Sequence, residues 1–396
     1  MIKVHMIETA SGWTLPESAQ HRREPARPVN RRPANFAAQF DELTVVYDCF
    51  RLKPTQVMLM APPLNRFDSI LDSLSVQSLP GSGECRYQLE HKFTLGFPSR
   101  RTDNLCRILV DVPEAADSLR LKSKAGETVL AIRPKSSQLF RDRRVLFTLS
   151  KDNDPRWICD WMRFHRDLQQ ADAVLLYDNG STAYTTQSLL QAMQQVAGFS
   201  TIVVMEWPYK YGPQGIGRGT WDSAFCQDGA MEDARWRFLG DAQGVLNCDV
   251  DELALSDTNL FEQVANSSSG CIRFPGRWVN APKNATSTSV PTHRESTYQL
   301  LPQWRWKSLR LKDINLCPTK WVVVPNRCPQ QTHWTAHEIV GMSSESMKPA
   351  QGFYRHFRQI STNWKNNRRD IERADELRYQ EDRKLQEAFT KVRWNA

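Results

Sequence analysis

The hydrophobic positions of the chain follow two patterns, and the change falls near residue 140. Between about residues 40 and 140, short apolar runs such as "LTVVYDCF" and "CRILVDV" are separated by turn residues at intervals typical of antiparallel strands. After residue 140, compact apolar runs alternate with segments in which apolar residues recur every three or four positions. The pattern predicts a small β-rich domain followed by an α/β domain.

The α/β part shows its pattern most clearly in four strand candidates and the helices between them. Strands are predicted at 144–150, 173–178, 201–207 and 244–249. The first helix is predicted to start at Asp154, because Asp is a good N-cap and the Pro that follows fits the first helical position. This repeated alternation favours a mostly parallel sheet with helices on both faces.

The two ends of the chain differ in composition from the rest. Residues 1–38 are rich in Pro and Arg and show little periodicity, which predicts a flexible, extended segment. We therefore divide the chain into that N-terminal extension, a β-rich domain (39–140), an α/β domain (141–362) and a charged C-terminal helix (363–396). In the last segment an apolar stripe at helical spacing is expected to pack on the α/β domain; it consists of Leu385, Ala388, Phe389 and Val392.

Composition and charge narrow the class of protein. With 40% hydrophobic and 24% charged residues, the chain resembles a soluble globular protein, and no apolar run is long enough to span a membrane. Nine scattered Cys without a C-x-x-C pair argue against a disulfide framework and a zinc site. The net charge of +8 concentrates in Arg-rich ends, but no nucleic-acid-binding module accompanies them. We expect a cytoplasmic protein that binds no nucleic acid, with peripheral membrane association through a basic face as an option.

The acidic stretch "LNCDVDELAL" at 246–255 follows the fourth predicted strand. Its Asp249 and Asp251 form an Asp-x-Asp motif, a spacing that a chain of this size contains by chance. Polar residues also follow the first three strands, and ligands bind parallel sheets at the carboxyl ends of the strands. If the strand stays extended, both aspartates point to one side and suit a divalent cation that also binds phosphate oxygens. The alternative is a polar turn on the surface.

The order of the motifs resembles that of glycosyltransferase family 92 and the related bacterial family-2-like glycosyltransferases. The segment "SKDNDPRWICDWMRFHRDLQQADAVLLYDNGST" is followed later in the chain by "LNCDVDEL". The matching positions are Asn153-Asp154, Trp161 to His165, Tyr177 to Ser181, Gln227, Asp249 to Leu253, and Arg355-His356-Phe357 with Trp364. The resemblance covers roughly 144–365 and implies a GT-A-like fold, the nucleotide-diphospho-sugar transferase architecture; it implies nothing about 39–140.

The resemblance implies a metal centre. Asp249 and Asp251 would hold Mn²⁺ or Mg²⁺ on the diphosphate of a nucleotide sugar, and His356 would supply a third ligand. His337 and then His333 are the alternatives to His356. Asp251 is also expected to act in catalysis.

The resemblance implies a donor site as well. Lys151, Asn153, Asp178 and Asn179 would shape the nucleotide pocket together with Asp249. Asp178 could equally form a turn, since Asp-Asn-Gly-Ser is a strong turn sequence. Lys210 and Arg235 would contact phosphates, although either could lie on a solvated face. Trp207, Tyr209 and Tyr211 are available to stack on sugars.

The resulting hypothesis is a metal-dependent glycosyltransferase that moves a hexose from a nucleotide-diphosphate sugar to a carbohydrate acceptor in polysaccharide assembly. Inversion at the anomeric carbon, as in family 92, needs a carboxylate base, for which Glu338 is preferred over Glu295. One alternative is a non-catalytic protein that binds nucleotide sugars or carbohydrate on the same fold. Another is a different carboxylate–metal enzyme, a nucleotidyl- or phosphotransferase.

Overall fold

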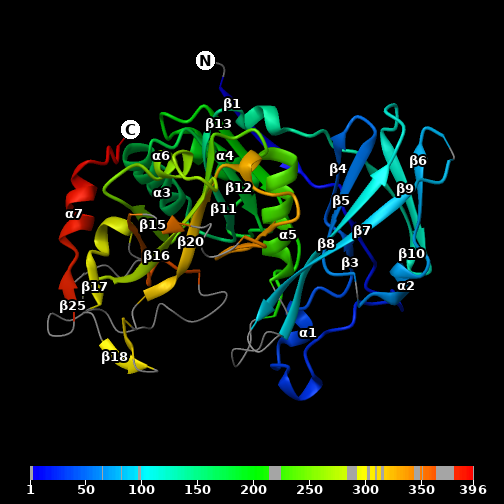
Figure 1. The fold of residues 1–396 in the computed structure, drawn as a ribbon, viewed down its shortest axis with the longest axis horizontal. Helices are drawn as coiled ribbons and strands as arrows, with labels where there is room; N and C mark the ends of the chain where they lie inside the picture. The colour runs from blue at the N-terminus through cyan, green and yellow to red at the C-terminus, as the bar shows by residue number, and fades with distance from the viewer. Residues whose placement is uncertain are drawn as a thin grey trace.

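The computed structural model shows a mixed α/β protein built on one large sheet (Figure 1). It describes residues 3–64, 66–81, 83–96, 100–213, 224–282, 292–300, 304–307, 310–313, 316–342, 348–349, 351–362 and 379–395. In Figure 1 the strands of the β-rich region, coloured blue to cyan, lie on one side of the molecule, and α7 lies at the opposite end.

The central sheet is parallel in its first half and mixed in its second. In spatial order its main path is β1 (Val4–Thr9), β13 (Thr201–Glu206), β12 (Ala173–Asp178), β11 (Arg144–Ser150), β14 (Gly244–Asn247), β20 (Leu316–Val323), β16 (Cys271–Asn280), β17 (Tyr298–Leu300) and β25 (Tyr379–Glu381). Three further strands join it beside β16: β15 (Glu252–Leu255), β23 (Lys348–Pro349) and β24 (Phe353–Phe357). The pairs from β1 to β14 are all parallel, whereas β20 runs antiparallel to both β14 and β16. The predicted mostly parallel sheet is therefore correct for the strands that lead to the Asp-x-Asp motif.

The central strands are apolar on both faces, because each face is covered. In β12, Val174 and Leu176 join one hydrophobic cluster, and Leu175 and Tyr177 join another on the opposite face. The helices are α1 (Phe36–Gln39), α2 (Asp68–Leu71), α3 (Pro155–Gln169), α4 (Thr186–Gln194), α5 (Phe225–Asp233), α6 (Leu260–Ala265) and α7 (Arg383–Thr390). The first cluster includes α3 and α4, and the second includes α5, so helices cover both faces as predicted.

Short helical turns complete the secondary structure. They are the 3-10 turns η1 (Val29–Arg31), η2 (Ser137–Phe140), η4 (His293–Glu295) and η5 (Pro325–Arg327), and the π-helical turn η3 (Ala234–Phe238). Helix α3 begins as the sequence predicts: Asp154 is its N-cap and accepts a hydrogen bond from the Arg156 amide.

The N-terminal segment differs from the prediction of a flexible extension. Strand β1 pairs in parallel with β13 and forms the edge of the central sheet. Arg23 is buried at 2% exposure, where its guanidinium donates to the carbonyls of Pro63, Asp41 and Thr44. Every described side chain of β1 is only partly buried or exposed, as suits an edge strand, so its sequence lacks the compact apolar run by which the central strands were predicted.

The region between β1 and β11 is rich in antiparallel strands, as predicted. One sheet contains β4 (Asp48–Lys53), β5 (Gln56–Ala61), β8 (Arg100–Asp111) and β7 (Tyr87–Gly96), and the other contains β10 (Gly126–Ala131), β9 (Ser118–Ser123) and β6 (Ser75–Leu79). The same region contains the short pair β2 (Trp13–Thr14) with β3 (Thr44–Val46). Two further short pairs lie later in the chain: β18 (Trp304–Lys307) with β19 (Arg310–Asp313), and β21 (His333–Trp334) with β22 (Ile339–Val340). A third hydrophobic cluster fills the space between the four-stranded and three-stranded sheets, and the former also contacts α5.

The predicted C-terminal helix (363–396) is shorter than expected in the described residues, because Tyr379–Glu381 forms β25 and α7 covers only Arg383–Thr390. Helix α7 packs on α3, as expected of the C-terminal apolar stripe. Leu385 and Ala388 are buried, and the ring of Phe389 meets that of Phe164 edge-on. Residues 363–378 lie outside the described part of the chain. None of the described helices is long and apolar enough to cross a membrane.

Candidate active site

The Asp-x-Asp motif forms a turn between β14 and β15 rather than continuing a strand. The Glu252 amide donates to the Asp249 carbonyl at 2.9 Å, which closes the turn. The expectation that an extended strand points Asp249 and Asp251 to the same side therefore does not apply. Both nevertheless line the same cavity.

The turn is held in place by the groups around it. His293 Nε2 donates to the Val250 carbonyl at 2.9 Å, and the Phe357 amide donates to the Asp251 carbonyl at 2.8 Å. Farther along, the Ala254 amide donates to His165 Nε2, so His165 donates through Nδ1 to the Trp161 carbonyl and is neutral. Burial lowers the pKa of His165 to about 3, in agreement with that role. The conformation of the motif is thus fixed from α3, η4 and β24.

A buried lysine compensates part of the negative charge of the motif. Lys320 Nζ, on β20, lies 2.8 Å from Asp249 Oδ2 and 3.0 Å from Glu252 Oε2. Glu252 also accepts from the Asp249 amide at 2.8 Å. Burial opposes the charge of Lys320, but Asp249 and Glu252 outweigh it and raise the lysine's pKa. Lys320 and Glu252 therefore position Asp249.

His356, on β24, lies beside Asp251 as predicted. Its Nε2 is 3.0 Å from Asp251 Oδ2, and the imidazole stacks on Trp278 with ring centroids 4.0 Å apart. Burial opposes protonation of this imidazole, but the charge of Asp251 and the hydrogen bond to it prevail and raise the pKa of His356 to about 10. Because burial alone would lower the pKa of His356, the raised pKa indicates a strongly negative electrostatic potential at this imidazole.

The cavity at the motif lies where the parallel strands end. Residues following β11, β12 and β14 contribute to its lining, as do α5 and β24. The predicted site residues that it brings together are Lys151, Asn153, Asn179, Asp249, Asp251 and His356. Gln227 and Tyr211 also line it, joined by a hydrogen bond of 2.6 Å between the tyrosine hydroxyl and the amide oxygen. Residues 360–362 complete the lining.

Two of the lining asparagines also hold the loops of the site. Asn153 donates to Ser150 Oγ at 2.9 Å. The Asn179 amide group donates to the carbonyls of Trp207 and Tyr209, each at 2.8 Å, which ties the end of β12 to the end of β13. Lys151 lies in the lining without an ion pair to another described residue.

Asp178 performs the turn role that the sequence left open as the alternative to nucleotide binding. It is buried at 4% exposure, and its carboxylate accepts from both the amide and the hydroxyl of Ser181. It is absent from the cavity lining. Its side chain supports the loop that presents Asn179 and is not placed to contact a nucleotide directly.

Lys210 and Glu338 lie elsewhere than predicted. Both are exposed, and neither lines the cavity. Glu338 lies between β21 and β22, where its backbone carbonyl accepts from Thr335. Glu295, the alternative base, is exposed and accepts from the Thr292 amide in a capping box. The exposed positions of the two glutamates do not support the prediction that either is the catalytic base.

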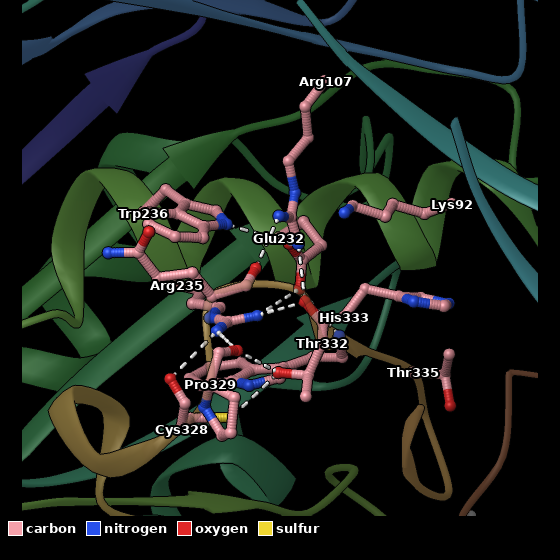
Figure 2. Close-up of polar contacts among 12 residues, drawn as sticks. Lys92, Arg107, Glu232, Arg235, Trp236, Cys328, Pro329, Thr332, His333 and Thr335 are labelled. Atoms are coloured by element: carbon pink, nitrogen blue, oxygen red, sulfur yellow. Dashed lines mark hydrogen bonds and ion pairs between the residues drawn. The ribbon is translucent and has the colours of Figure 1, made fainter. Parts of the chain in front are cut away.

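Arg235 is a structural residue, contrary to the prediction that it contacts the donor. Figure 2 shows its guanidinium among the backbone carbonyls of the 328–332 segment. It donates to the Thr332 carbonyl at 2.6 Å and the Pro329 carbonyl at 2.8 Å, and it pairs with Glu232. With 4% of its surface exposed, it is enclosed away from the cavity lining.

Of the remaining aromatic and histidine candidates, one lines the cavity and the other described ones lie elsewhere. Trp207 is fully buried and donates to the Cys226 carbonyl, and the Tyr209 hydroxyl donates to the Tyr47 carbonyl, so of the three aromatic candidates Tyr211 alone lines the cavity. His337 is exposed next to Thr319, and His333 is buried next to Asn104. Trp364 lies outside the described residues.

Sequence reasoning missed Lys320 and His293. Both lie in segments without a motif, and each bonds to the Asp-x-Asp turn from a distant part of the sequence. The available signal was a lysine directly before the apolar run Trp321–Val323, the buried end of β20.

The donor set at the turn fits a divalent cation. Asp251, Glu252 and His356 each offer a ligand atom, and these atoms lie within 4.8 Å of one another. Carboxylate oxygens with one imidazole suit Mn²⁺ and, with fewer nitrogen ligands, Mg²⁺. Asp249, 34% exposed in its side chain, adds a further carboxylate at the cavity surface.

Comparison with sequence models of protein families identifies a family for this chain. The sequence model of glycosyltransferase family 92 matches residues 150–393, more than half of the chain and the whole of the acid-rich turn with its supporting residues. A search of curated proteins gives no match.

Proposed function

The chain belongs to glycosyltransferase family 92, and from this premise we propose that it transfers a hexose from a nucleotide-diphosphate sugar to a carbohydrate acceptor with the help of Mn²⁺ or Mg²⁺. The observation that carries the proposal is the convergence of Asp249, Asp251 and His356 on a single cavity at the strand ends. The parallel strands that precede this turn also support a GT-A-like arrangement of the α/β region.

The proposed site uses the cavity in two parts. Asp249, Asp251 and His356 would hold the cation, which when bound neutralises the diphosphate that leaves the sugar. Lys151 and Asn153, on the loop after β11, would bind the nucleotide part of the donor. Asn179 fixes the neighbouring loop through its bonds to Trp207 and Tyr209, which keeps that wall in position before the donor arrives.

The supporting residues prepare the motif for a highly charged ligand. Lys320 and Glu252 hold Asp249, and His293 holds the backbone of the turn. These contacts restrict the motif to one conformation, so that binding needs little reorganisation. An inverting outcome needs a base for the acceptor hydroxyl, and among the described lining residues Asp249 and Asp251 are the only carboxylates. We retain Asp251 as a catalytic candidate and propose a role in polysaccharide assembly for the product.

The test is a panel of uridine, guanosine and thymidine diphosphate sugars, scored by thermal unfolding with Mn²⁺ or with a chelator. We expect at least one donor to raise the melting temperature in the presence of Mn²⁺, because a ligand that binds only the folded state stabilises it by mass action. Asp251→Asn should remove the response. Asp257→Asn, at an exposed position that pairs only loosely with Lys384, is the matched control and should keep it.

The two alternatives give different results in the same experiment. Donor binding without release of nucleoside diphosphate in the presence of acceptors would indicate a non-catalytic binding protein. Stabilisation by nucleoside triphosphates, but by no nucleotide sugar, would indicate a nucleotidyl- or phosphotransferase. No response to any donor would remove the main support for the proposal.

A further inference from the structure

A second cavity lies between the β-rich region and the segment that follows α5. Its lining shares no residue with the strand-end cavity. Gln227 near the start of α5 lines the first cavity, and Trp236 in η3 lines the second. These residues are nine positions apart, which corresponds to roughly 13 Å along a helix axis. The two cavities are therefore separate sites that one helical segment connects.

One face of the four-stranded sheet forms part of this second cavity. On β8, Ile108 and Val110 point into the core between the two antiparallel sheets, while Arg107 and Leu109 point the other way, towards the cavity. The neighbouring strands β5 and β7 add Met58 and Lys92 to the lining. The apolar part of the lining is thus the outer face of a sheet whose inner face is fully packed.

Arg107 is the most deeply buried charged residue of the lining. It is 2% exposed, and its terminal nitrogens donate to Glu232 and to the carbonyls of Gln330 and Thr332 (Figure 2). Its Nε–H is buried and has no acceptor among the described residues. This Nε has almost no accessible surface, so Arg107 contributes to the wall of the cavity through its packing and its paired charge rather than as a donor to a ligand.

The uncompensated positive charge of the cavity lies at its edge. Glu232 neutralises Arg107, and Lys92 pairs with Glu90 at 3.0 Å. Lys53 and Lys135 are exposed and form no ion pair with a described residue. Two such lysines beside an aromatic and apolar lining attract an anion that also has a non-polar surface.

Trp236 and three glutamines supply the remaining chemistry. The indole is half-buried, and its Nε1 donates to Glu232 at 2.9 Å. The guanidiniums of Arg107 and Arg235 lie over the ring at 5.0 Å and 4.8 Å from its centroid, so only the part of the indole that faces the cavity is open to a ligand. The ring is therefore rigidly held. Gln56, Gln330 and Gln331 add amide donors and acceptors to the lining. A charged sugar is bound by amides that bond to its hydroxyl groups, by an aromatic ring that contacts its CH groups, and by lysines that pair with its acidic groups. The cavity offers all three kinds of group.

We propose that this cavity binds an anionic oligosaccharide, one that carries carboxylate or sulfate groups, at a site distinct from the strand-end cavity. The acidic groups contact Lys53 and Lys135, the sugar rings contact the part of Trp236 that faces the cavity, and the glutamine amides bond to sugar hydroxyls. Most of the lining comes from the β-rich region, which lies outside the family match. The site does not depend on the metal centre or on the transfer reaction.

The test measures equilibrium binding of a uronic-acid hexamer, a sulfated hexamer and a neutral hexamer to the full chain at low and moderate salt. We expect one or both acidic hexamers to bind and the neutral hexamer to bind at least about tenfold more weakly. The doubly substituted Lys53→Glu/Lys135→Glu variant should lose about tenfold or more in affinity for the acidic hexamer that binds. Trp236→Leu should lose affinity as well, while the lysine variant keeps the wild-type melting temperature because both side chains are exposed.

Matched controls separate this site from a general basic surface and from the strand-end cavity. Lys122→Glu/Lys124→Glu makes the same charge change at exposed positions of the β-rich region outside the cavity and should bind as the wild type does. Asp251→Asn should also bind normally. The proposal is overturned if neither acidic hexamer binds, if the control pair loses as much affinity as the lysine pair, or if Asp251→Asn abolishes binding. Equal binding of inorganic polyphosphate or of a polyglutamate peptide would also overturn it, because these polyanions have no sugar ring.

Discussion

Glu232 and Glu252 are both fully buried carboxylates next to cations, yet their surroundings differ in charge. Glu232 lies between Arg107 and Arg235 and also accepts from Trp236 Nε1 and the Trp334 amide (Figure 2). Glu252 has Lys320 at 3.0 Å, but it shares its site with Asp249 and Asp251. One cluster has more cations than carboxylates, and the other has three carboxylates within a single turn.

The pKa values of the two glutamates follow this difference. Burial raises the pKa of Glu232, but the charges of Arg107 and Arg235 outweigh it and lower the value to about 2. Burial raises the pKa of Glu252 as well; there Lys320 opposes the shift while Asp249 adds to it, and the result is a raised pKa. A carboxylate whose charge is fully compensated by the protein stabilises the fold. The carboxylate cluster at Glu252 keeps an excess of negative charge, which the proposed cation would compensate.

The substitution with the largest expected effect tests the proposed role of the acid-rich turn that contains Glu252. Asp251→Asn removes one carboxylate that faces the cavity and His356, so we expect kcat/KM for sugar transfer to fall on the order of 10²–10³-fold. The measurement is nucleoside diphosphate release at saturating Mn²⁺. An activity within a few-fold of wild type would show that the acid-rich turn is not the reaction centre.

The substitution with the next largest effect changes the stability of the fold and tests the compensated cluster around Glu232. Glu232→Gln leaves the buried guanidiniums of Arg107 and Arg235 without their counter-charge, so we expect the free energy of unfolding to fall by about 3–5 kcal/mol. Urea denaturation followed by tryptophan fluorescence measures it. The control is Glu127→Gln, which removes an exposed partner of Arg120 and should cost about 0–1 kcal/mol. Equal effects of the two substitutions would contradict the compensated-cluster interpretation.

Acidification should remove the same stabilisation gradually. Because the folded-state pKa of Glu232 is lowered to about 2, its contribution is present above the unfolded pKa and is lost as the pH falls towards that value. We expect the stability difference between wild type and Glu232→Gln to shrink by about 2 kcal/mol between about pH 6 and about pH 3. Denaturation curves at intermediate pH values check the slope. A difference that stays constant over this range would mean that folding does not shift the pKa of Glu232.

The same comparison shows what the sequence could and could not predict. The strand ends were predictable, because β11, β12 and β14 are local apolar runs followed by polar residues, and parallel strands bring those ends together. This is why Lys151, Asn179 and Asp249 meet at one cavity. The resemblance to the family placed His356 beside Asp251, which local patterns alone do not do.

What escaped prediction depends on long-range partners. Arg235 is a plausible phosphate ligand by residue type, but the carbonyls that use its donors lie in a much later segment of the chain. Lys320 reaches Asp249 from a later strand, and β1, at the start of the chain, pairs with β13 near its middle. A sequence shows which side chains could carry a charge, but the compensation of that charge depends on the tertiary structure.

The smallest expected effect concerns Glu338, which belongs to neither carboxylate cluster. Its side chain is exposed and absent from the lining of the strand-end cavity, so Glu338→Gln should change kcat/KM by no more than about threefold, whereas loss of a general base costs about 10²–10⁴-fold. Steady-state kinetics alongside Asp251→Asn, with Glu295→Gln as the matched exposed control, measures both substitutions on one scale. A loss on the order of 10²-fold or more in Glu338→Gln alone would mean that the segment between β21 and β22 moves to the acceptor during the reaction. A small effect in both variants would exclude these two exposed glutamates as the base and would leave Asp249 and Asp251 as the carboxylate candidates among the described residues that line the cavity.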